Sequence, residues 1–296
     1  MPRPFACTMV LLLSAAPALG AGQAARERSI LVTVLDRESA PVKDLKAADV
    51  VVREDGAIRE VVDVKPAGEP LTIALLVDTT TPTMGANAPT LEMRAGLQAF
   101  VRTIQGANPA SQIGMWEFAG AGVQTVKFTT KTEDLTKKIQ RLFPVKQSGG
   151  VLLEALVDAS KELGKKPGPR RVIVSVSLNS PETSTIEPRQ VADAIAKSGA
   201  SFWAVSIQSN ADAQTSSQGS TPSREMILDR VPSTSGGLRL TGVAGISLES
   251  QLQRIANALT SQYEVVYVRP DAAPAPSRIE AMSKRGAKVL TGPWMR

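Results

Sequence analysis

Asp78, Thr79 and Thr80 stand directly after the apolar run of residues 71–77, within the sequence LTIALLVDTTTPTMG. A buried strand that ends in one carboxylate and a group of hydroxyls presents polar oxygens that a protein core does not need. The arrangement therefore indicates a binding or catalytic site. The alternative is that these three residues only turn the chain at the strand end, because short polar side chains often bond to neighbouring backbone groups.

The chemistry of such a site is limited by what the chain lacks. It contains no histidine, which removes the commonest general base, the Ser/His/Asp relay and imidazole ligands for zinc. A serine, threonine or lysine nucleophile needs no histidine, but the Gly-x-Ser-x-Gly elbow, the Walker-type phosphate loop and the paired Ser-x-x-Lys and Lys-Thr-Gly motifs are all missing. We therefore predict no catalytic residues and a protein that is not an enzyme. A hydrolase with a serine or threonine nucleophile is the alternative.

The elements around Asp78 predict an α/β fold. Residues 71–77, 172–176 and 202–207 are nearly continuous apolar runs, the pattern of parallel strands covered on both faces. Helices with an apolar stripe at spacings of three and four alternate with them. The stripes are Met93, Leu97, Phe100 and Ile104, then Leu152, Leu156, Ala159 and Leu163, and finally Leu248, Leu252, Ile255 and Leu259. Residues 113–128 read as a hairpin around Gly-Ala-Gly, which adds one antiparallel edge strand. We expect a doubly wound, mostly parallel, Rossmann-like sheet over residues 71–268.

A small β module precedes this domain, at residues 28–68. Its short runs are rich in β-branched residues, and Asp55-Gly56 is a strong hairpin signal between two of them. A module of so few strands buries little surface by itself, and it must therefore pack on the neighbouring domain. The strand-like segments at 263–268 and 278–292 are expected to return to it, with residues 269–296 as a C-terminal β extension.

Residues 1–20 resemble a secretory signal peptide, with an early arginine, an apolar stretch and small residues at the expected cleavage position. The apolar stretch is shorter than the ~20 residues that cross a bilayer, and no later stretch comes closer. We therefore expect a secreted or periplasmic protein without a transmembrane segment in the mature chain. The only cysteine, Cys7, lies inside the signal, so no disulfide is expected.

The net charge is +6, from 34 basic and 28 acidic residues that are interspersed along the chain. Residues 164–171 form the one dense basic patch, and aromatic residues make up only 4% of the sequence. Nucleic-acid binding depends on clustered positive charge and on aromatic side chains that stack on bases. We expect no nucleic-acid partner.

Ligands of doubly wound sheets bind outside the carboxyl ends of the strands. The loop that begins at Asp78, the loop after residues 172–176 and the Ser-Gly-Gly turn at residues 148–150 should therefore lie together. An apolar strand that ends in Asp-x-Thr, an antiparallel edge hairpin and a Gly-Gly turn before a helix together resemble the von Willebrand factor A (VWFA) domain. The segment VTVLDRESAPVKDLKAADVVVREDGAIREVVDV that leads into LTIALLVDTT is similar to secreted bacterial VWFA-related domain proteins, and the resemblance covers most of residues 29–292.

The resemblance implies a divalent cation, such as magnesium, in a metal-ion-dependent adhesion site (MIDAS), held by hard oxygen ligands. Its first loop reads Asp-x-Ser-x-Ser, with threonine allowed, so Asp78 and Thr80 match and the third position falls on Pro82. The threonine of the second loop falls on Val151 and the aspartate of the third loop on Ser177. We therefore expect a degenerate site without a complete ligand set.

The predicted binding residues are Asp78, Thr80, Ser148 and Ser177, and Asp78 and Thr80 would be the metal ligands if magnesium binds. Nearby oxygens that would compensate only after a loop shift are those of Thr83, Ser148, Asn179 and Glu182. The resemblance implies an exported, non-enzymatic module that binds a protein or a cell-envelope partner through this end of the sheet. Two alternatives remain open: metal-dependent adhesion with substitute ligands around Asp78, and envelope assembly through a free edge of the small β module.

Overall fold

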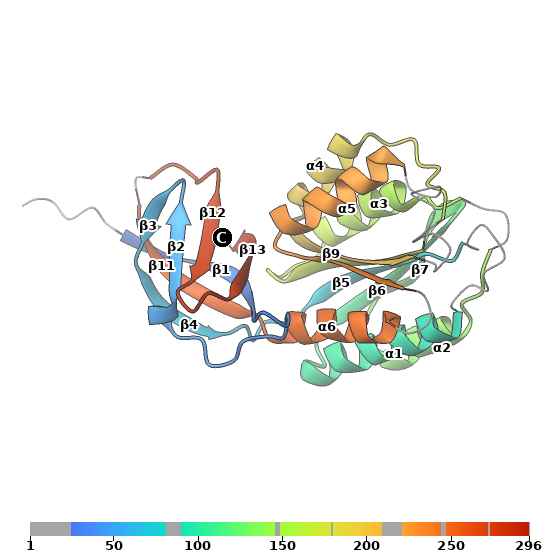
Figure 1. Ribbon diagram of the computed structural model, residues 1–296, viewed down its shortest axis with the longest axis horizontal. Coiled ribbons are helices and arrows are strands. Elements are labelled where there is room, and N and C mark those ends of the chain that lie inside the picture. The colour runs from blue at the N-terminus through green and yellow to red at the C-terminus, as the bar shows by residue number, and fades with distance from the viewer. Residues whose placement is uncertain are drawn as a thin grey trace, which may run out of the picture.

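A computed structural model describes residues 25–80, 90–145, 149–178, 180–208, 221–243, 247–271 and 273–295. The segment expected to be a signal peptide, residues 1–20, lies outside these ranges. Figure 1 shows an all-β lobe at the left and an α/β lobe at the right. Both ends of the described chain belong to the all-β lobe, so the chain leaves that lobe, builds the α/β lobe and returns. No helix in the described ranges is long and apolar enough to span a bilayer.

The α/β lobe is built on a six-stranded sheet with the order β10-β9-β8-β5-β6-β7. Its strands are β5 (Thr72–Val77), β6 (Gln112–Ala119), β7 (Ala121–Thr129), β8 (Arg171–Leu178), β9 (Ala200–Gln208) and β10 (Arg239–Val243). All neighbours are parallel except β6 and β7, which form an antiparallel hairpin. The doubly wound sheet with one antiparallel edge strand is therefore confirmed.

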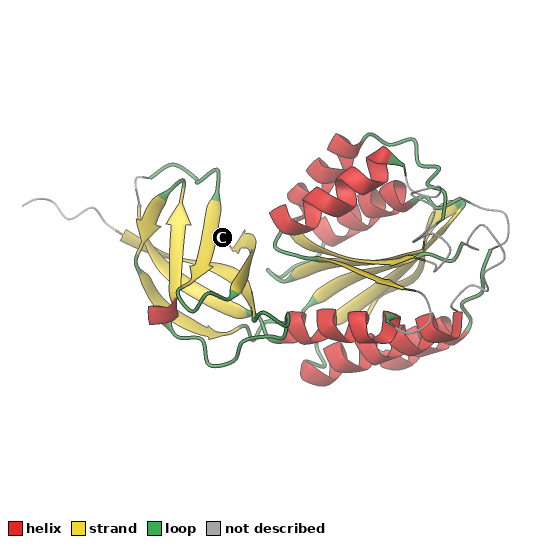
Figure 2. Ribbon diagram, in the orientation of Figure 1, coloured by secondary structure: helices red, strands yellow, loops and turns green. Residues whose placement is uncertain are grey.

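Helices cover both faces of this sheet (Figure 2). On one face lie α1 (Thr90–Ala107), α2 (Thr132–Gln140) and α6 (Leu248–Thr260), and on the other lie α3 (Leu152–Gly164), α4 (Pro188–Ser198) and α5 (Pro222–Thr234). The predicted apolar stripes of α1, α3 and α6 are buried in two separate cores, one on each face. The strands therefore bury side chains on both faces, as their continuous apolar runs predict.

The all-β lobe contains two sheets. The first has the order β13-β1-β11-β4 and consists of β1 (Ala25–Leu35), β4 (Val61–Pro66), β11 (Tyr263–Pro270) and β13 (Lys288–Met295). The second has the order β12-β2-β3 and consists of β2 (Val50–Glu54), β3 (Ala57–Arg59) and β12 (Ile279–Ser283), with a 3₁₀ turn at Ala47–Asp49 before β2. The expected return of the C-terminal strands to this lobe is confirmed.

The chain passes between the two sheets of this lobe at Glu60, which separates β3 from β4. Strand β11 pairs with β1 and β4, so residues 263–268, which we expected at the end of the α/β domain, form part of a sheet of the all-β lobe. The physical reason is that β11 buries alternate residues, as a strand with one covered face does.

The junction between the lobes is fixed by a buried arginine. Arg170, just before β8, donates hydrogen bonds to the carbonyl oxygens of Ala67, Glu69 and Leu259 at 2.6–3.0 Å and to Gln262 Oε1 at 3.1 Å. Burial lowers the pKa of Arg170 to about 10. The guanidinium therefore ties the incoming linker and the outgoing chain to the same end of the six-stranded sheet.

Candidate functional site

The carboxyl ends of β5 and β8 lie side by side and place Asp78 in the sheet. Val77 pairs with Val176 in parallel register, and the backbone NH of Asp78 donates to Val176 O at 2.9 Å. Asp78 therefore continues the ladder by one residue and turns its side chain towards the loop that follows β8. Its exposed fraction is 0%.

The carboxylate of Asp78 accepts four hydrogen bonds. The backbone NH and the hydroxyl of Thr80 donate to Oδ1 at 2.9 and 2.6 Å. The backbone NH of Leu178 and the hydroxyl of Ser180 donate to Oδ2 at 2.9 and 3.1 Å. Each oxygen thus uses both of its acceptor positions. Asp78 holds the loop after β5 and the loop after β8 together.

The Gly-Gly turn before α3 also contacts the loop after β8. We call the hydrogen-bonded residues at these strand ends the Asp78 cluster. Gly150 donates its NH to Pro181 O at 2.7 Å and accepts a bond from the NH of Thr183 at 2.8 Å. A Cβ atom added to Gly149 would lie 2.3 Å from Thr183 Cγ2, so the turn leaves no room for a side chain there. The predicted convergence of the three loops is therefore observed.

The residues predicted from the sequence have different places in this cluster. Thr80 is buried, and its hydroxyl donates a hydrogen bond to the carboxylate of Asp78. Ser177 is buried one position beyond the Val77–Val176 pair, and its hydroxyl has no hydrogen-bond partner among the described residues. Val151 precedes α3 and packs its side chain into the apolar core. Ser148 lies outside the described residues, as do Pro82, Thr83 and Asn179.

The sequence prediction missed two residues of this cluster, Ser180 and Arg224, which lies in the first turn of α5. Arg224 is 3% exposed, and its guanidinium donates to Leu178 O at 2.7 Å and Ser180 O at 2.8 Å. The same guanidinium lies 4.0 Å from Glu182 Oε2. One sequence signal was available, because a cation is unfavourable in the first turn of a helix, where the macrodipole favours acids.

Burial and local charges act in opposite directions on the two buried acids. Burial raises the pKa of the Asp78 carboxyl, while the bond from Thr80 and the charge of Arg224 oppose this rise. Burial also raises the pKa of Glu182, against the bond from Ser184 and the charge of Arg224. The four donors around Asp78 favour its ionised form and so act against burial.

Exposed apolar side chains flank the Asp78 loop. Phe143 and Val145, which follow α2, are 68% and 44% exposed, and Leu91 at the start of α1 is 74% exposed. The backbone NH of Val145 donates to Thr79 O at 2.7 Å, which fixes this segment beside the loop. The guanidinium carbon of Arg94 lies 5.1 Å from the ring centroid of Phe143. We call Leu91, Phe143 and Val145 the apolar rim.

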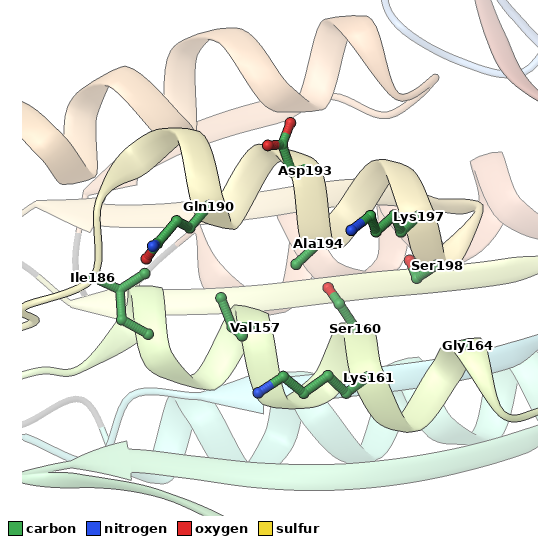
Figure 3. A pocket seen from close by; sticks show the side chains of 10 residues that line it. All are labelled: Val157, Ser160, Lys161, Gly164, Ile186, Gln190, Asp193, Ala194, Lys197 and Ser198. Atoms are coloured by element: carbon green, nitrogen blue, oxygen red, sulfur yellow. The ribbon is translucent and has the colours of Figure 1, made fainter.

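The crevice between the rim and Asp78 is too small for a ligand. It has a volume of about 10 Å³ and is lined by Asp78, Thr79, Thr80, Thr90, Met93, Leu142, Phe143, Pro144 and Leu178. A larger groove of about 640 Å³ lies elsewhere, on the outer surface between α3 and α4 (Figure 3). None of the predicted site residues lines that groove. Among the described residues, the crevice beside Asp78 therefore offers too little space for a small molecule.

The described residues do not fit the divalent cation that the sequence resemblance implies. Both oxygens of Asp78 are already occupied by hydrogen-bond donors, and Val151 has no side-chain oxygen. The described ranges hold no group of three or more acidic, histidine or cysteine side chains placed to bind a metal. A cation near Asp78 would also be repelled by the guanidinium of Arg224, which binds the same loop.

The fold and this cluster define a class of protein, a doubly wound α/β domain whose strand ends meet around a buried Asp-x-Thr loop. The family model of the von Willebrand factor type A domain matches residues 72–235, which is more than half of the 296 residues. The chain belongs to the von Willebrand factor type A domain family.

Solved structures share this fold at low sequence identity. Proximal thread matrix protein 1 from the mussel byssus has 16% identity and a TM-score of 0.52, with 64% of this chain and 48% of that chain covered. The structure of the same mussel protein with a zinc-occupied MIDAS motif has 14% identity and a TM-score of 0.51, with 73% and 48% covered. BatB from Bacteroides thetaiotaomicron has 13% identity and a TM-score of 0.50, with 64% and 100% covered. The chain therefore spans about half of the mussel protein, and a search of curated proteins gave no match.

Proposed function

We propose that this chain is an exported, non-enzymatic binding module that engages a protein or cell-envelope partner through the carboxyl edge of its six-stranded sheet. Domains of this family often serve in adhesion or protein interaction. The signal-like sequence of residues 1–20 supports export to the periplasm or the cell exterior. Neither a catalytic residue nor a cofactor is part of the proposal, and the MIDAS of this chain is degenerate.

The apolar rim is the observation that carries this proposal. Leu91, Phe143 and Val145 expose apolar surface, and the backbone of Val145 is hydrogen-bonded to Thr79 directly after β5. Exposed apolar side chains that gather on a rigid surface are typical of protein-binding sites, and aromatic residues supply much of the binding energy in such sites. Arg94 beside Phe143 adds a cation that a partner's acidic group can bind. The shallow surface favours a macromolecular partner over a small ligand.

The all-β lobe supports one competing function, assembly through strand pairing. Strand β3 lies at the edge of its sheet, and Ile58 within it is 66% exposed. An edge strand with free backbone groups can accept a strand from another chain. We regard β1–β4 and β11–β13 as one module, with residues 71–262 as the binding domain.

Two surface substitutions distinguish the two functions. Phe143→Asp and Ile58→Asp each place a charge on an exposed position, so the fold is retained. The immobilised mature protein is incubated with the envelope fraction of the producing organism, with and without EDTA, and the captured partner is identified. Loss of capture in Phe143→Asp, with capture retained in Ile58→Asp and in EDTA, supports the proposal. The opposite pattern assigns binding to the β module.

An enzymatic function is tested with the same preparation. Purified protein is assayed with generic ester, peptide and phosphate substrates, beside the Asp78→Ala variant. We expect no turnover by either protein. Turnover that is abolished by Asp78→Ala would overturn the non-enzymatic assignment and support the hydrolase alternative.

A further inference from the structure

Asp78 and Arg224 bind the same two residues, Leu178 and Ser180. The carboxylate of Asp78 accepts bonds from the NH of Leu178 and the hydroxyl of Ser180, while Arg224 donates to the carbonyl oxygens of these same residues. The last residue of β8 and Ser180 are therefore held both by the carboxylate that follows β5 and by a guanidinium from α5.

Both charges are removed from water. Asp78 is 0% exposed and Arg224 is 3% exposed, and Glu182, which is 8% exposed, lies on the far side of the guanidinium. A buried carboxylate without a compensating charge is strongly unfavourable. Within the described residues Arg224 is the cation that lies close to both acids. The cluster is thus a buried acid–base–acid arrangement.

We infer that the guanidinium of Arg224 supplies the positive charge that a divalent cation supplies in a metal-dependent site of this kind. A metal site gathers the loops at the strand ends by binding their oxygens. Here Arg224 binds oxygens of the loop after β8, and Asp78 binds donors from the loops after β5 and β8. Side chains of the protein itself hold these loops together, and the structure of the site does not depend on a bound ion.

A simpler role for Arg224 makes a different prediction. An arginine that only attaches α5 to the sheet through two carbonyl bonds would contribute the same stability whether or not residue 78 carries a charge. An arginine that neutralises Asp78 contributes much less once that charge is gone. The two roles are therefore separated by a double-mutant cycle between positions 78 and 224.

The experiment measures thermal unfolding of the mature protein and of Arg224→Met, Asp78→Asn and the double variant, each in EDTA, MgCl₂ and MnCl₂. Arg171→Met is the matched control, because Arg171 also donates to two backbone carbonyls, those of Lys166 and Ser198, and forms no ion pair with Asp78. We expect no change in the melting temperature of the wild type with either ion. We expect Arg224→Met to lower the melting temperature by several degrees more when residue 78 is aspartate than when it is asparagine.

Two results would overturn the inference. One is a rise in the melting temperature of the wild type with Mg²⁺ or Mn²⁺ that Asp78→Asn abolishes, since this would show a metal at the site. The other is that the changes in melting temperature caused by Arg224→Met and Asp78→Asn simply add in the double variant. The same additivity is expected of the control pair, Arg171→Met and Asp78→Asn. If Arg224→Met fails to fold, the wild-type measurement alone still decides between a metal and a resident cation. No partner is needed, so failure here is distinguishable from failure of the proposed binding function.

Discussion

The hydroxyl of Thr80 donates a 2.6 Å hydrogen bond to Oδ1 of Asp78, and the backbone NH of Thr80 donates to the same oxygen at 2.9 Å. The two residues that the sequence marks as metal ligands are therefore bound to each other. The two bonds form a closed turn at residues 78–80, directly after β5. The pair thus has a structural role that is independent of any ligand.

We predict that Asp78→Ala and Ser177→Ala have opposite outcomes, although both residues were predicted site residues. Asp78→Ala removes the acceptor of four hydrogen bonds and leaves the charge of Arg224 less compensated, so it should lower the free energy of unfolding by about 3–5 kcal/mol. Ser177→Ala removes a buried hydroxyl without a described partner and should cost less than about 1 kcal/mol. Urea unfolding followed by circular dichroism measures both values. Equal losses would contradict the assignment of Asp78 as the centre of the cluster.

We predict that Thr80→Val destabilises the protein by about 1.5–3 kcal/mol, the usual range for a lost hydrogen bond to a charged group. Valine keeps the shape of threonine and the backbone NH bond to Asp78, so the loss reports on the hydroxyl. Thr80→Ser retains the hydroxyl and is the control, with an expected cost of about 0.8 kcal/mol for the missing methyl group. A Thr80→Val variant as stable as Thr80→Ser would show that the 2.6 Å bond contributes nothing.

The pH dependence of stability should change when Asp78 is replaced by asparagine. Because burial raises the pKa of Asp78 above its ordinary value of 3.8, the folded state binds the proton more tightly than the unfolded state. The contribution of Asp78 to the free energy of unfolding is then largest below pH 3.8 and falls as the pH rises through the folded-state pKa.

The measurement is urea unfolding of wild type and Asp78→Asn at several pH values from about 4 to about 7. The stability of the wild type relative to the variant should fall as the pH rises. Arg224 and Glu182 are present in both proteins, so the comparison isolates the replacement of Asp78. A relative stability that rises with pH would mean that the four donors and Arg224 outweigh burial.

We predict that Arg170→Met loosens the junction between the lobes. It removes the bonds to Ala67, Glu69, Leu259 and Gln262, so amide hydrogen exchange in the linker at residues 66–70 should increase. The matched control is Arg171→Met, which loses carbonyl bonds within the α/β lobe and should leave the linker protected. Unchanged linker exchange in Arg170→Met would show that apolar contacts alone hold the junction.

The sequence predicts most of the fold because the signals are long and periodic. The apolar runs of β5, β8 and β9 and the stripe of α1 require burial on defined faces, and the hairpin of β6 and β7 contains its own glycine turn. Residues 263–268 were expected at the end of the α/β domain, and they form part of β11 in the other lobe. A strand that buries alternate residues, as β11 does, fits the antiparallel sheet of that lobe.

The candidate site is less predictable because half of its contacts involve backbone groups. Asp78 accepts bonds from the NH groups of Thr80 and Leu178, and a pattern of side chains does not reveal such donors. Arg224 is distant from Asp78 in the sequence, and arginine is usually exposed. Its unfavourable place in the first turn of a helix is a weak signal that does not by itself place it in the core. Ser177 was chosen by position after a strand, yet Leu178 and Ser180 make the contacts.

The most direct test of a metal-independent site is a crystal structure of the mature protein grown or soaked in MnCl₂, with anomalous scattering measured for manganese. We predict no anomalous peak within about 2.6 Å of either oxygen of Asp78, the upper end of oxygen–cation bond lengths. We also predict that the guanidinium of Arg224 bonds to Leu178 and Ser180 as described. A manganese ion bonded to Asp78, with the hydroxyl of Thr80 turned towards the ion, would contradict a metal-independent site.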